Sequence, residues 1–282
     1  MNATEKELFE KAIKEVVDLH GNMAVLSKLD ILLKDYNSDL SDAEELIQSD
    51  GALSATIVRI SNSVIYRIGD RCDTIRSALY NIGFNEALKL VSLALSKQVF
   101  MRNLDAYGIS ADNYWRYSYF TAVFMEGQAK RFGFEANNAY LIGLLHSIGR
   151  VVINELLHKR EIEIYWDRFI PPDVWEKESI GFSSEVAGSL LLKNWDFSLE
   201  MYQRVENQRK PSKIDSDPLL LLLDYARLVS INLEDSEALA SLCEKGAHPY
   251  LIKQPQSSEE LLSAIAETAD YVADIYKSLK DC

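Results

Sequence analysis

The sequence predicts an all-α protein, and three observations support this fold class. Apolar residues recur at intervals of three and four along most of the chain, as on one face of a helix. Alternating stretches rich in β-branched residues, which are typical of strands, are rare. Helix start and stop signals divide the chain at short intervals, among them Asp217-Pro218 at a start and Gly83 and Gly133 at stops.

The first hundred residues predict a group of short helices. Ser41 and Glu44 have the spacing of a capping box, which would start a helix that continues to Gln48. Asp73 is expected to cap the helix that ends at Gly83. One expected helix carries Leu8, Ile13, Val16 and Val17. The others are expected over 24–33, 41–48, 51–60, 74–82 and 84–100.

A turn-rich joint over 103–112 precedes a second group of helices. Ser183 is expected to cap one of them. The expected ranges are about 113–131, 136–157, 184–191, 199–208, 219–231 and 259–280. We therefore divide the chain into an N-terminal helix (1–20), an N-terminal lobe (21–102), a second lobe (103–216) and a C-terminal helical extension (217–282).

Composition and charge exclude several classes of protein. The 282 residues are 48% hydrophobic and 26% charged, which is typical of a globular protein. The net charge of −13 repels phosphate backbones and anionic lipid, so we expect neither a nucleic acid nor a membrane as partner. The basic residues of 204–213, namely Arg204, Arg209, Lys210 and Lys213, are interpreted as a solvated surface.

The cysteines and the N-terminus indicate a cytoplasmic protein. Cys72, Cys243 and Cys282 are odd in number and far apart, which favours reduced thiols over a disulfide framework. The first twenty residues lack the basic start and apolar run of a signal peptide, and no run reaches the roughly 18 uninterrupted apolar residues of a membrane span.

Several motifs together resemble one family. The heptapeptide LLHSIGR over 144–150 is similar to the LLHDIGR signature of HD-superfamily phosphohydrolases, with Ser147 in place of the aspartate. Upstream, ELIQSDGALSATIVRISNSVIY (45–66) and TIRSALYNIGF (74–84) resemble segments of the HDOD domain, a bacterial signalling relative of those enzymes.

The resemblance continues through WRYS at 115–118 and GFSSEVAG at 181–188, and it closes at Trp195 and at Pro211, 16 residues later. It covers about Met23 to Lys213. The chain is thus identified as a member of the HDOD family, which implies a helical lobe packed on an HD-like helical lobe.

The resemblance also identifies the positions at which HD enzymes hold metal ions, and these positions are degenerate. In those enzymes histidine nitrogens and aspartate oxygens bind metals that activate water. The corresponding residues here are Tyr117, His146, Ser147, Ser184, Gln208 and Arg209. Tyrosine, serine and glutamine are poor ligands, and arginine repels a cation. With only four histidines in the chain, we expect no metal, no cofactor and no catalytic residue.

The sequence therefore predicts a non-catalytic signalling module that binds another protein. Three alternatives stay open: a pseudo-enzyme whose old pocket binds a nucleotide or other phosphate through Arg209, a weak metal-dependent phosphohydrolase, and a structural subunit. A homo-oligomer is also left open. For individual residues we expect a packed histidine at 146, an exposed Arg209, tryptophans in the core, and a capping or interhelical hydrogen bond at Asn62.

Overall fold

The computed structural model describes Ile13 and residues 23–35, 37–63, 65–67, 69–252 and 255–280. Throughout these ranges the regular secondary structure is helical, and the sole β contact is an isolated bridge between Leu104 and Ile109. The all-α prediction is therefore confirmed. The helix expected within the first twenty residues lies outside the described residues, except for the buried Ile13.

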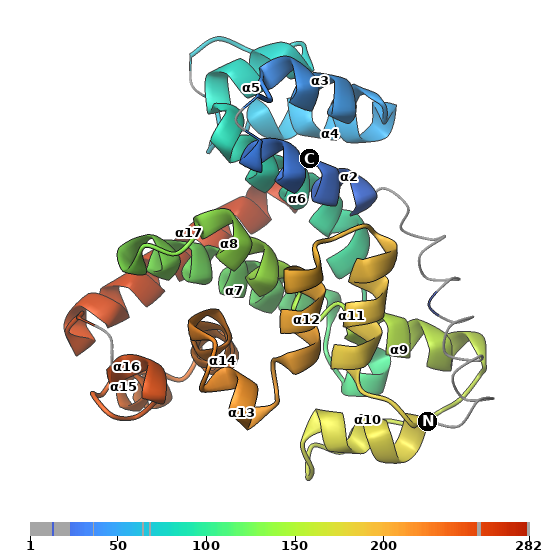
Figure 1. Ribbon diagram of the computed structural model, residues 1–282, viewed down its shortest axis with the longest axis vertical. Helices are drawn as coiled ribbons and strands as arrows, with labels where there is room; N and C mark the ends of the chain where they lie inside the picture. The colour runs from blue at the N-terminus through green and yellow to red at the C-terminus, as the bar shows by residue number, and fades with distance from the viewer. Residues whose placement is uncertain are drawn as a thin grey trace.

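Five helices form a group at one end of the molecule (Figure 1). They are α2 (Ala24–Lys34), α3 (Leu40–Gln48), α4 (Gly51–Ser61), α5 (Ile75–Ile82) and α6 (Phe84–Phe100). Leu26, Ile47, Leu53 and Leu79 are completely buried between them. The apolar periodicity of this part of the sequence thus faces a common core.

Two of the predicted caps in this group are wrong by one or two residues. The capping box of α3 is formed by Asp39 and Asp42 instead of Ser41 and Glu44: Asp39 Oδ1 accepts from the Ser41 amide at 2.7 Å, and the Asp39 amide donates to Asp42 Oδ2 at 2.8 Å. Thr74, not Asp73, caps α5. Aspartate, serine and threonine all cap well, so neighbouring candidates compete and the sequence alone does not choose between them.

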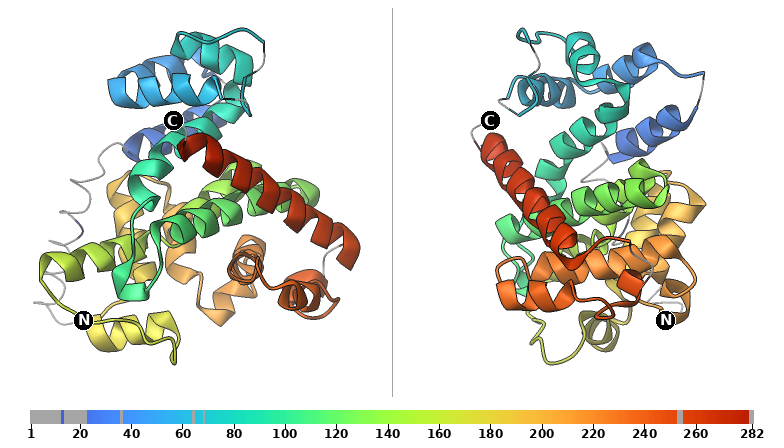
Figure 2. Two further views of the ribbon diagram at one scale, coloured as in Figure 1. Left: turned by 180° about the vertical axis from the view of Figure 1, so that it is seen from behind. Right: turned by 90° about the vertical axis from the view of Figure 1, so that its left-hand side faces the viewer.

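The remaining helices form the larger part of the molecule around α7 (Figures 1 and 2). They are η2 (Asp105–Tyr107), α7 (Ala111–Phe132), α8 (Ala136–Leu145), α9 (Gly149–Lys159), α10 (Pro172–Ile180), α11 (Ser184–Asn194), α12 (Leu199–Asn207), α13 (Pro211–Ile214), α14 (Pro218–Ile231), α15 (Ser236–Leu242), α16 (Pro249–Ile252) and α17 (Ser258–Lys280). Helix α7 contacts α6, α8, α14 and α17. It is therefore the central helix of the fold.

The helix predicted over 136–157 is in fact two helices. A turn at His146, Ser147 and Ile148 separates α8 from α9. The sequence does not reveal this break, because none of the three residues is a glycine or proline. By length and composition 136–159 could cross a membrane, but 72% of its apolar window is buried inside the molecule, so the segment serves as core.

Helix α17 runs from the side of α15 and α16 towards the group formed by α2 to α6 (Figure 2). It lies along α7, where Lys280 Nζ is 3.2 Å from Asp112 Oδ2. It also reaches the segment after α4, where the hydroxyls of Tyr66 and Tyr271 are 3.1 Å apart. The C-terminal extension is thus packed against both groups of helices.

The structure also tests the expectations for single residues. The core prediction is confirmed for Trp115, Trp175 and Trp195, which are buried, but it is wrong for the half-buried Trp166. The hydrogen-bond prediction for Asn62 is confirmed, since its side chain donates to the carbonyl of Cys72 at 2.7 Å and accepts from the Cys72 amide at 2.8 Å.

The basic residues of 204–213 do not all lie on a solvated surface. Lys210 and Lys213 are exposed, as predicted. Arg204 is only 17% exposed and pairs with Asp217, while Arg209 is 25% exposed and pairs with Glu185. The exposed arginine expected at 209 is therefore wrong, because a buried carboxylate from α11 holds its guanidinium.

Candidate functional site

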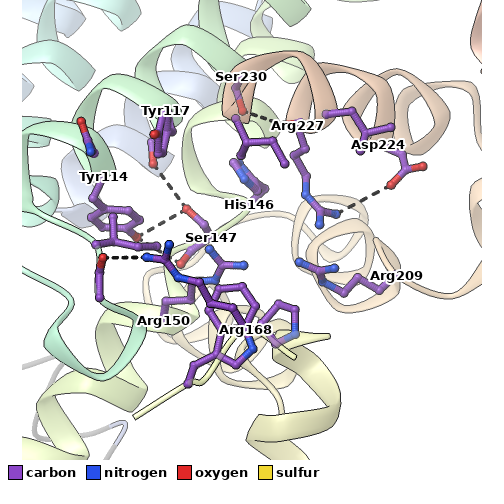
Figure 3. A pocket seen from close by; sticks show the side chains of 18 residues that line it. Tyr114, Tyr117, His146, Ser147, Arg150, Arg168, Arg209, Asp224, Arg227 and Ser230 are labelled. Atoms are coloured by element: carbon purple, nitrogen blue, oxygen red, sulfur yellow. Dashed lines mark hydrogen bonds and ion pairs between the residues drawn. The ribbon is translucent and has the colours of Figure 1, made fainter. Parts of the chain in front are cut away.

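A cavity of about 540 Å³ lies between α7, the turn joining α8 to α9, α14 and the loop that leads to α10 (Figure 3). This volume is within the range of about 300–1,000 Å³ that is usual for small-molecule sites. Four of the six positions singled out by the sequence line it, namely Tyr117, His146, Ser147 and Arg209. The fold thus brings together residues from parts of the chain that are far apart in sequence.

Two close helix contacts hold the turn that carries His146 and Ser147. A Cβ atom on Gly149 would lie 1.8 Å from the carbonyl oxygen of Ser184, so the start of α9 touches the backbone of α11. A Cβ on Gly143 would lie 2.7 Å from Cα of Ala122 in α7. These two glycines permit the close approach of α9 to α11 and of α8 to α7, which fixes the turn between α8 and α9.

His146 is a neutral, hydrogen-bonded side chain. Its Nδ1 is 2.7 Å from the carbonyl oxygen of Gly143, and since a carbonyl can only accept, Nδ1 carries the proton. Burial lowers the pKa of His146 to about 3, and the nearby charge of Arg227 acts in the same direction. The ring is therefore uncharged at neutral pH, with the lone pair on Nε2.

Ser147 belongs to a hydroxyl network on the wall formed by α7. The Tyr114 hydroxyl donates to the carbonyl oxygen of Ser147 at 3.1 Å, and burial raises the pKa of Tyr114 to about 12. The Ser147 hydroxyl lies 3.4 Å from both the Tyr114 hydroxyl and the Ser118 hydroxyl. The residue that the resemblance aligns with the aspartate of HD enzymes is therefore part of a network of neutral hydroxyl groups.

Ser184 and Gln208 do not line the cavity. Ser184 is buried at the start of α11, and its amide donates to Glu176 Oε2 at 2.6 Å. Gln208 is 2% exposed, and its Nε2 donates to the carbonyl oxygens of His146 and Val205. Both residues hold the helices together instead of pointing a ligand atom at the others.

Three arginines that the sequence analysis did not identify also line the cavity, together with Arg209: they are Arg150, Arg168 and Arg227. Arg150 has its guanidinium carbon 5.3 Å from the centre of the Tyr107 ring. Arg168 donates to the carbonyl oxygen of Gly108 at 3.1 Å. Figure 3 shows the four guanidinium groups around one space.

The guanidinium group of Arg227 lies in surroundings that are unfavourable for a positive charge. Its side chain is 17% exposed, and its Nη1 atom is buried without a hydrogen-bond partner; the nearest carboxylate oxygen is Asp224 Oδ1, at 4.0 Å. Burial lowers the pKa of Arg227 to about 9, and the charges of Arg209 and Arg150 contribute to the shift. The group remains charged at neutral pH despite this unfavourable surrounding.

A sequence signal for these arginines exists, although it is weak. Arg150 is the last residue of the LLHSIGR motif. Asp224 and Arg227 are the two charged residues of the otherwise apolar α14, and a charge in such a helix usually has a function or a partner. Nothing in the sequence shows, however, that α14 packs beside α7 and brings Arg227 to the same cavity.

The residues present do not fit a hydrolytic metal centre. Over the described ranges no group of three or more histidine, cysteine, aspartate or glutamate side chains converges. Of the carboxylates in the described part of the chain, Asp224 alone lines the cavity, and its Oδ2 lies 3.2 Å from His248 Nε2. Four guanidinium groups would repel a divalent cation from the same space.

Comparisons with solved structures support the fold. The structure of a Shewanella amazonensis protein described as a candidate phosphohydrolase superposes with a TM-score of 0.70 and 20% identity, covering 96% of this chain and 98% of that one. A Geobacter sulfurreducens HDOD domain protein of unknown function gives 0.65 and 18%, covering 89% and 91%. A candidate signal transduction protein from Marinobacter aquaeolei gives 0.65 and 20%, covering 97% and 66%.

Sequence comparison identifies the family. An uncharacterized protein of Treponema pallidum is 29% identical over 163 residues, which are 56% of this chain and 31% of that protein. The chain thus matches less than a third of the length of that relative. The HDOD domain matches residues 22–211, more than half of the chain. Together with the helical fold, this match shows that the chain belongs to the HDOD family of signalling-type domains.

Proposed function

We propose that this chain is a non-catalytic regulatory module that acts by binding another protein. The observation that carries the proposal is the set of four arginines, Arg150, Arg168, Arg209 and Arg227, around a cavity that also holds four of the positions aligned by the resemblance with metal ligands of HD enzymes. Phosphoester hydrolysis by those enzymes needs bound cations to activate water and to neutralise the phosphoryl group. A cavity lined by fixed positive charge repels such cations and attracts anions.

The cavity also lacks a general base for hydrolysis without a metal. A useful base has a pKa close to the working pH. His146, with a pKa of about 3, is too weak a base at neutral pH. Burial alone would raise the pKa of Asp224, but its hydrogen bond from His248 and the charge of Arg227 lower it below the usual value.

Two features support protein binding as the mode of action. HDOD domains are signalling-type domains, and the chain matches this family over 190 of its residues, 22–211. The loop that contributes Trp166 and Arg168 to the cavity also carries Phe169, which is 90% exposed, and Tyr165, which is 62% exposed. Exposed aromatic side chains are of the kind that protein interfaces bury.

A phosphoesterase assay tests the non-catalytic proposal. The purified chain is incubated with bis(p-nitrophenyl) phosphate and p-nitrophenyl phosphate in the presence of Mn²⁺, Mg²⁺ or Fe²⁺. We expect no turnover above that of a His146→Asn control prepared in parallel. Metal-dependent turnover that His146→Asn abolishes would contradict the proposal, whereas activity equal in both preparations comes from a contaminant and leaves the result negative.

Partner binding is tested separately by affinity capture from the native cell with the wild-type chain and with a Tyr165→Ser/Phe169→Ser variant as bait. We expect a protein retained by the wild type and reduced with the variant. Equal retention by both baits would show that the loop does not contribute to binding.

A further inference from the structure

We propose that the cavity is a receptor site for a phosphate monoester with a flat ring, of the nucleoside monophosphate class. This inference deepens the proposed function, since it requires that the bound phosphate is not hydrolysed. It rests on the charge balance of the cavity, on one unsatisfied guanidinium nitrogen and on the apolar part of the wall.

The charge balance favours an anionic ligand. Arg150, Arg168, Arg209 and Arg227 line the cavity, whereas among the described residues Asp224 is the one carboxylate of its wall. Outside the wall, Glu185 lies beside Arg209, and the buried Glu176 is close enough to Arg150 to interact with its charge. Positive charge therefore remains in excess, and a phosphate monoester, which carries about two negative charges at neutral pH, supplies the opposite charge.

The arginines have donors left for a ligand. Arg209 uses Nε for Glu185 Oε1, at 2.7 Å, which holds the guanidinium in place. Arg227 Nη1 has no hydrogen-bond partner. Throughout the described part of the chain Arg150 has no ion pair and instead lies against the Tyr107 ring. Guanidinium groups bind phosphate oxygens through two parallel hydrogen bonds, so these residues present the donors that a phosphate accepts.

Clustering these arginines is unfavourable without an anion. Like charges within a partly buried space repel each other, and this repulsion contributes, after burial, to the lowered pKa of Arg227. Such an arrangement lowers stability and is retained at binding sites, where the ligand supplies the opposite charge. The repulsion among these arginines in the free protein is thus consistent with a site at which a bound anion neutralises part of their charge.

The other wall of the cavity suits an apolar ring. Trp166, Pro172, Leu228 and Ile231 line it. The Trp166 indole nitrogen donates to the carbonyl oxygen of Ile170 at 2.7 Å, which fixes the ring in the loop before α10. Aromatic and apolar walls stack on flat rings, whereas inorganic phosphate would leave this wall uncovered.

A polymer is a poorer fit than a small molecule. The net charge of −13 repels a nucleic-acid strand over the rest of the surface. A cavity of about 540 Å³ has room for one nucleotide-sized ligand. A phosphorylated peptide remains as the competing occupant, and the experiment includes it.

The test is isothermal titration of the full chain with AMP, GMP, cyclic AMP, adenosine, inorganic phosphate and a phosphoserine peptide. AMP, cyclic AMP and adenosine share a ring and differ in charge, so they form a matched series. We expect AMP or GMP to bind more tightly than cyclic AMP, adenosine or phosphate, and to lose affinity as salt is added. No binding of AMP or GMP, equal binding of adenosine, or tighter binding of the peptide would each overturn the proposal.

Arg227→Gln and Arg150→Gln provide two independent variants. Each removes a charged donor to the phosphate, so we expect each to weaken AMP or GMP binding about tenfold or more. Arg204→Gln is the control: Arg204 is also 17% exposed and paired with a carboxylate, but it does not line the cavity. Circular dichroism verifies that the variants are folded. Wild-type affinity in both cavity variants would overturn the proposal.

Failure of this inference is distinguishable from failure of the proposed function. Release of inorganic phosphate from AMP or GMP during the titration would contradict the non-catalytic function, even if binding is observed. If neither binding nor phosphate release is observed, the proposed receptor site is wrong, whereas the proposed non-catalytic function is not contradicted.

Discussion

The side-chain amide of Gln208 donates a hydrogen bond of 2.7 Å to the main-chain carbonyl of His146. The motif resemblance aligns both residues with metal ligands of HD enzymes, yet the contact between them is structural. The same Nε2 donates to the carbonyl of Val205 at 2.9 Å, so Gln208 holds the end of α12 to the turn between α8 and α9. That turn carries the one histidine of the cavity.

Replacing Gln208 should therefore affect stability. In Gln208→Ala the carbonyl of His146 loses its donor in a buried region, so we expect the free energy of unfolding to fall by about 1–3 kcal/mol. Gln203→Ala is the control, because Gln203 lies on the exposed side of the same helix. Urea unfolding measures both, and equal effects of the two substitutions would show that the contact contributes nothing.

Because α9 and α11 are in close contact, adding one methyl group at Gly149 should lower the stability of the protein strongly. The Cβ of Gly149→Ala would lie 1.8 Å from the Ser184 oxygen and 2.6 Å from the Gly188 nitrogen, both of which are backbone atoms. We expect a loss of about 3 kcal/mol or more in the free energy of unfolding. Gly127→Ala, at an exposed helical position with nothing within 4 Å, should instead stabilise by up to about 1 kcal/mol. Thermal unfolding of both variants checks the pair, and a Gly149→Ala protein as stable as wild type would contradict the helix packing described here.

The pKa of His146 predicts a dependence of stability on pH. Below about pH 6.5 the unfolded chain binds a proton at this residue that the folded chain, with a pKa of about 3, does not bind. The free energy of unfolding should thus fall as the pH decreases from 6.5 towards 3, and this residue should contribute a loss of about 2 kcal/mol between pH 7 and pH 5.

The matched variant for this effect is His146→Asn, which keeps a donor for the Gly143 carbonyl but does not titrate. Urea unfolding at the two pH values should give a smaller loss for this variant than for the wild type. His158→Asn, at an exposed position, should behave as the wild type. An identical pH dependence in His146→Asn and wild type would show that His146 titrates normally in the folded protein.

Restoring a single aspartate should not restore a metal site. In Ser147→Asp one carboxylate would stand beside His146, but Tyr117 would still provide no nitrogen ligand, Ser184 and Gln208 would still lie outside the cavity, and Arg209 would still oppose a cation. Metal affinity requires several converging groups. We expect Ser147→Asp to bind no Mn²⁺, to hydrolyse no phosphoester and to bind AMP or GMP more weakly than Ser147→Asn, its uncharged control. Binding of Mn²⁺ in titration calorimetry, or turnover, would show that the other ligands are already in place.

The sequence predicts the fold well because its signals are local. Helix α6 has the predicted bounds, 84–100, and the Asp217-Pro218 start of α14 is confirmed, with Asp217 Oδ1 accepting from the Leu219 amide at 2.9 Å. Errors occur where several residues can perform the same task, as at the caps of α3 and α5. The break after α8 depends on packing against α7 and α11, which no local pattern records.

The site is only partly predictable for the same reason. The motif resemblance gives the positions 117, 146, 147 and 209, which the fold brings to one cavity. It does not give Arg227, since α14 lies beyond the matched residues 22–211. Arg227 reaches the cavity through the packing of α14 beside α7, which is a tertiary contact between distant segments.

Elemental analysis is the most direct test of the central claim, that the cavity of this HDOD chain is built for an anion and not for catalytic metal. The full chain is expressed in medium supplemented with Mn, Fe, Mg and Zn, purified without a metal-binding tag, dialysed, and measured by mass spectrometry of the elements. We predict far less than one equivalent of any of these metals per chain, because four arginines surround the cavity and no set of ligands converges among the residues that the structure describes. About one metal ion per chain, lost in a His146→Asn variant, would contradict the account and would reopen the phosphohydrolase interpretation.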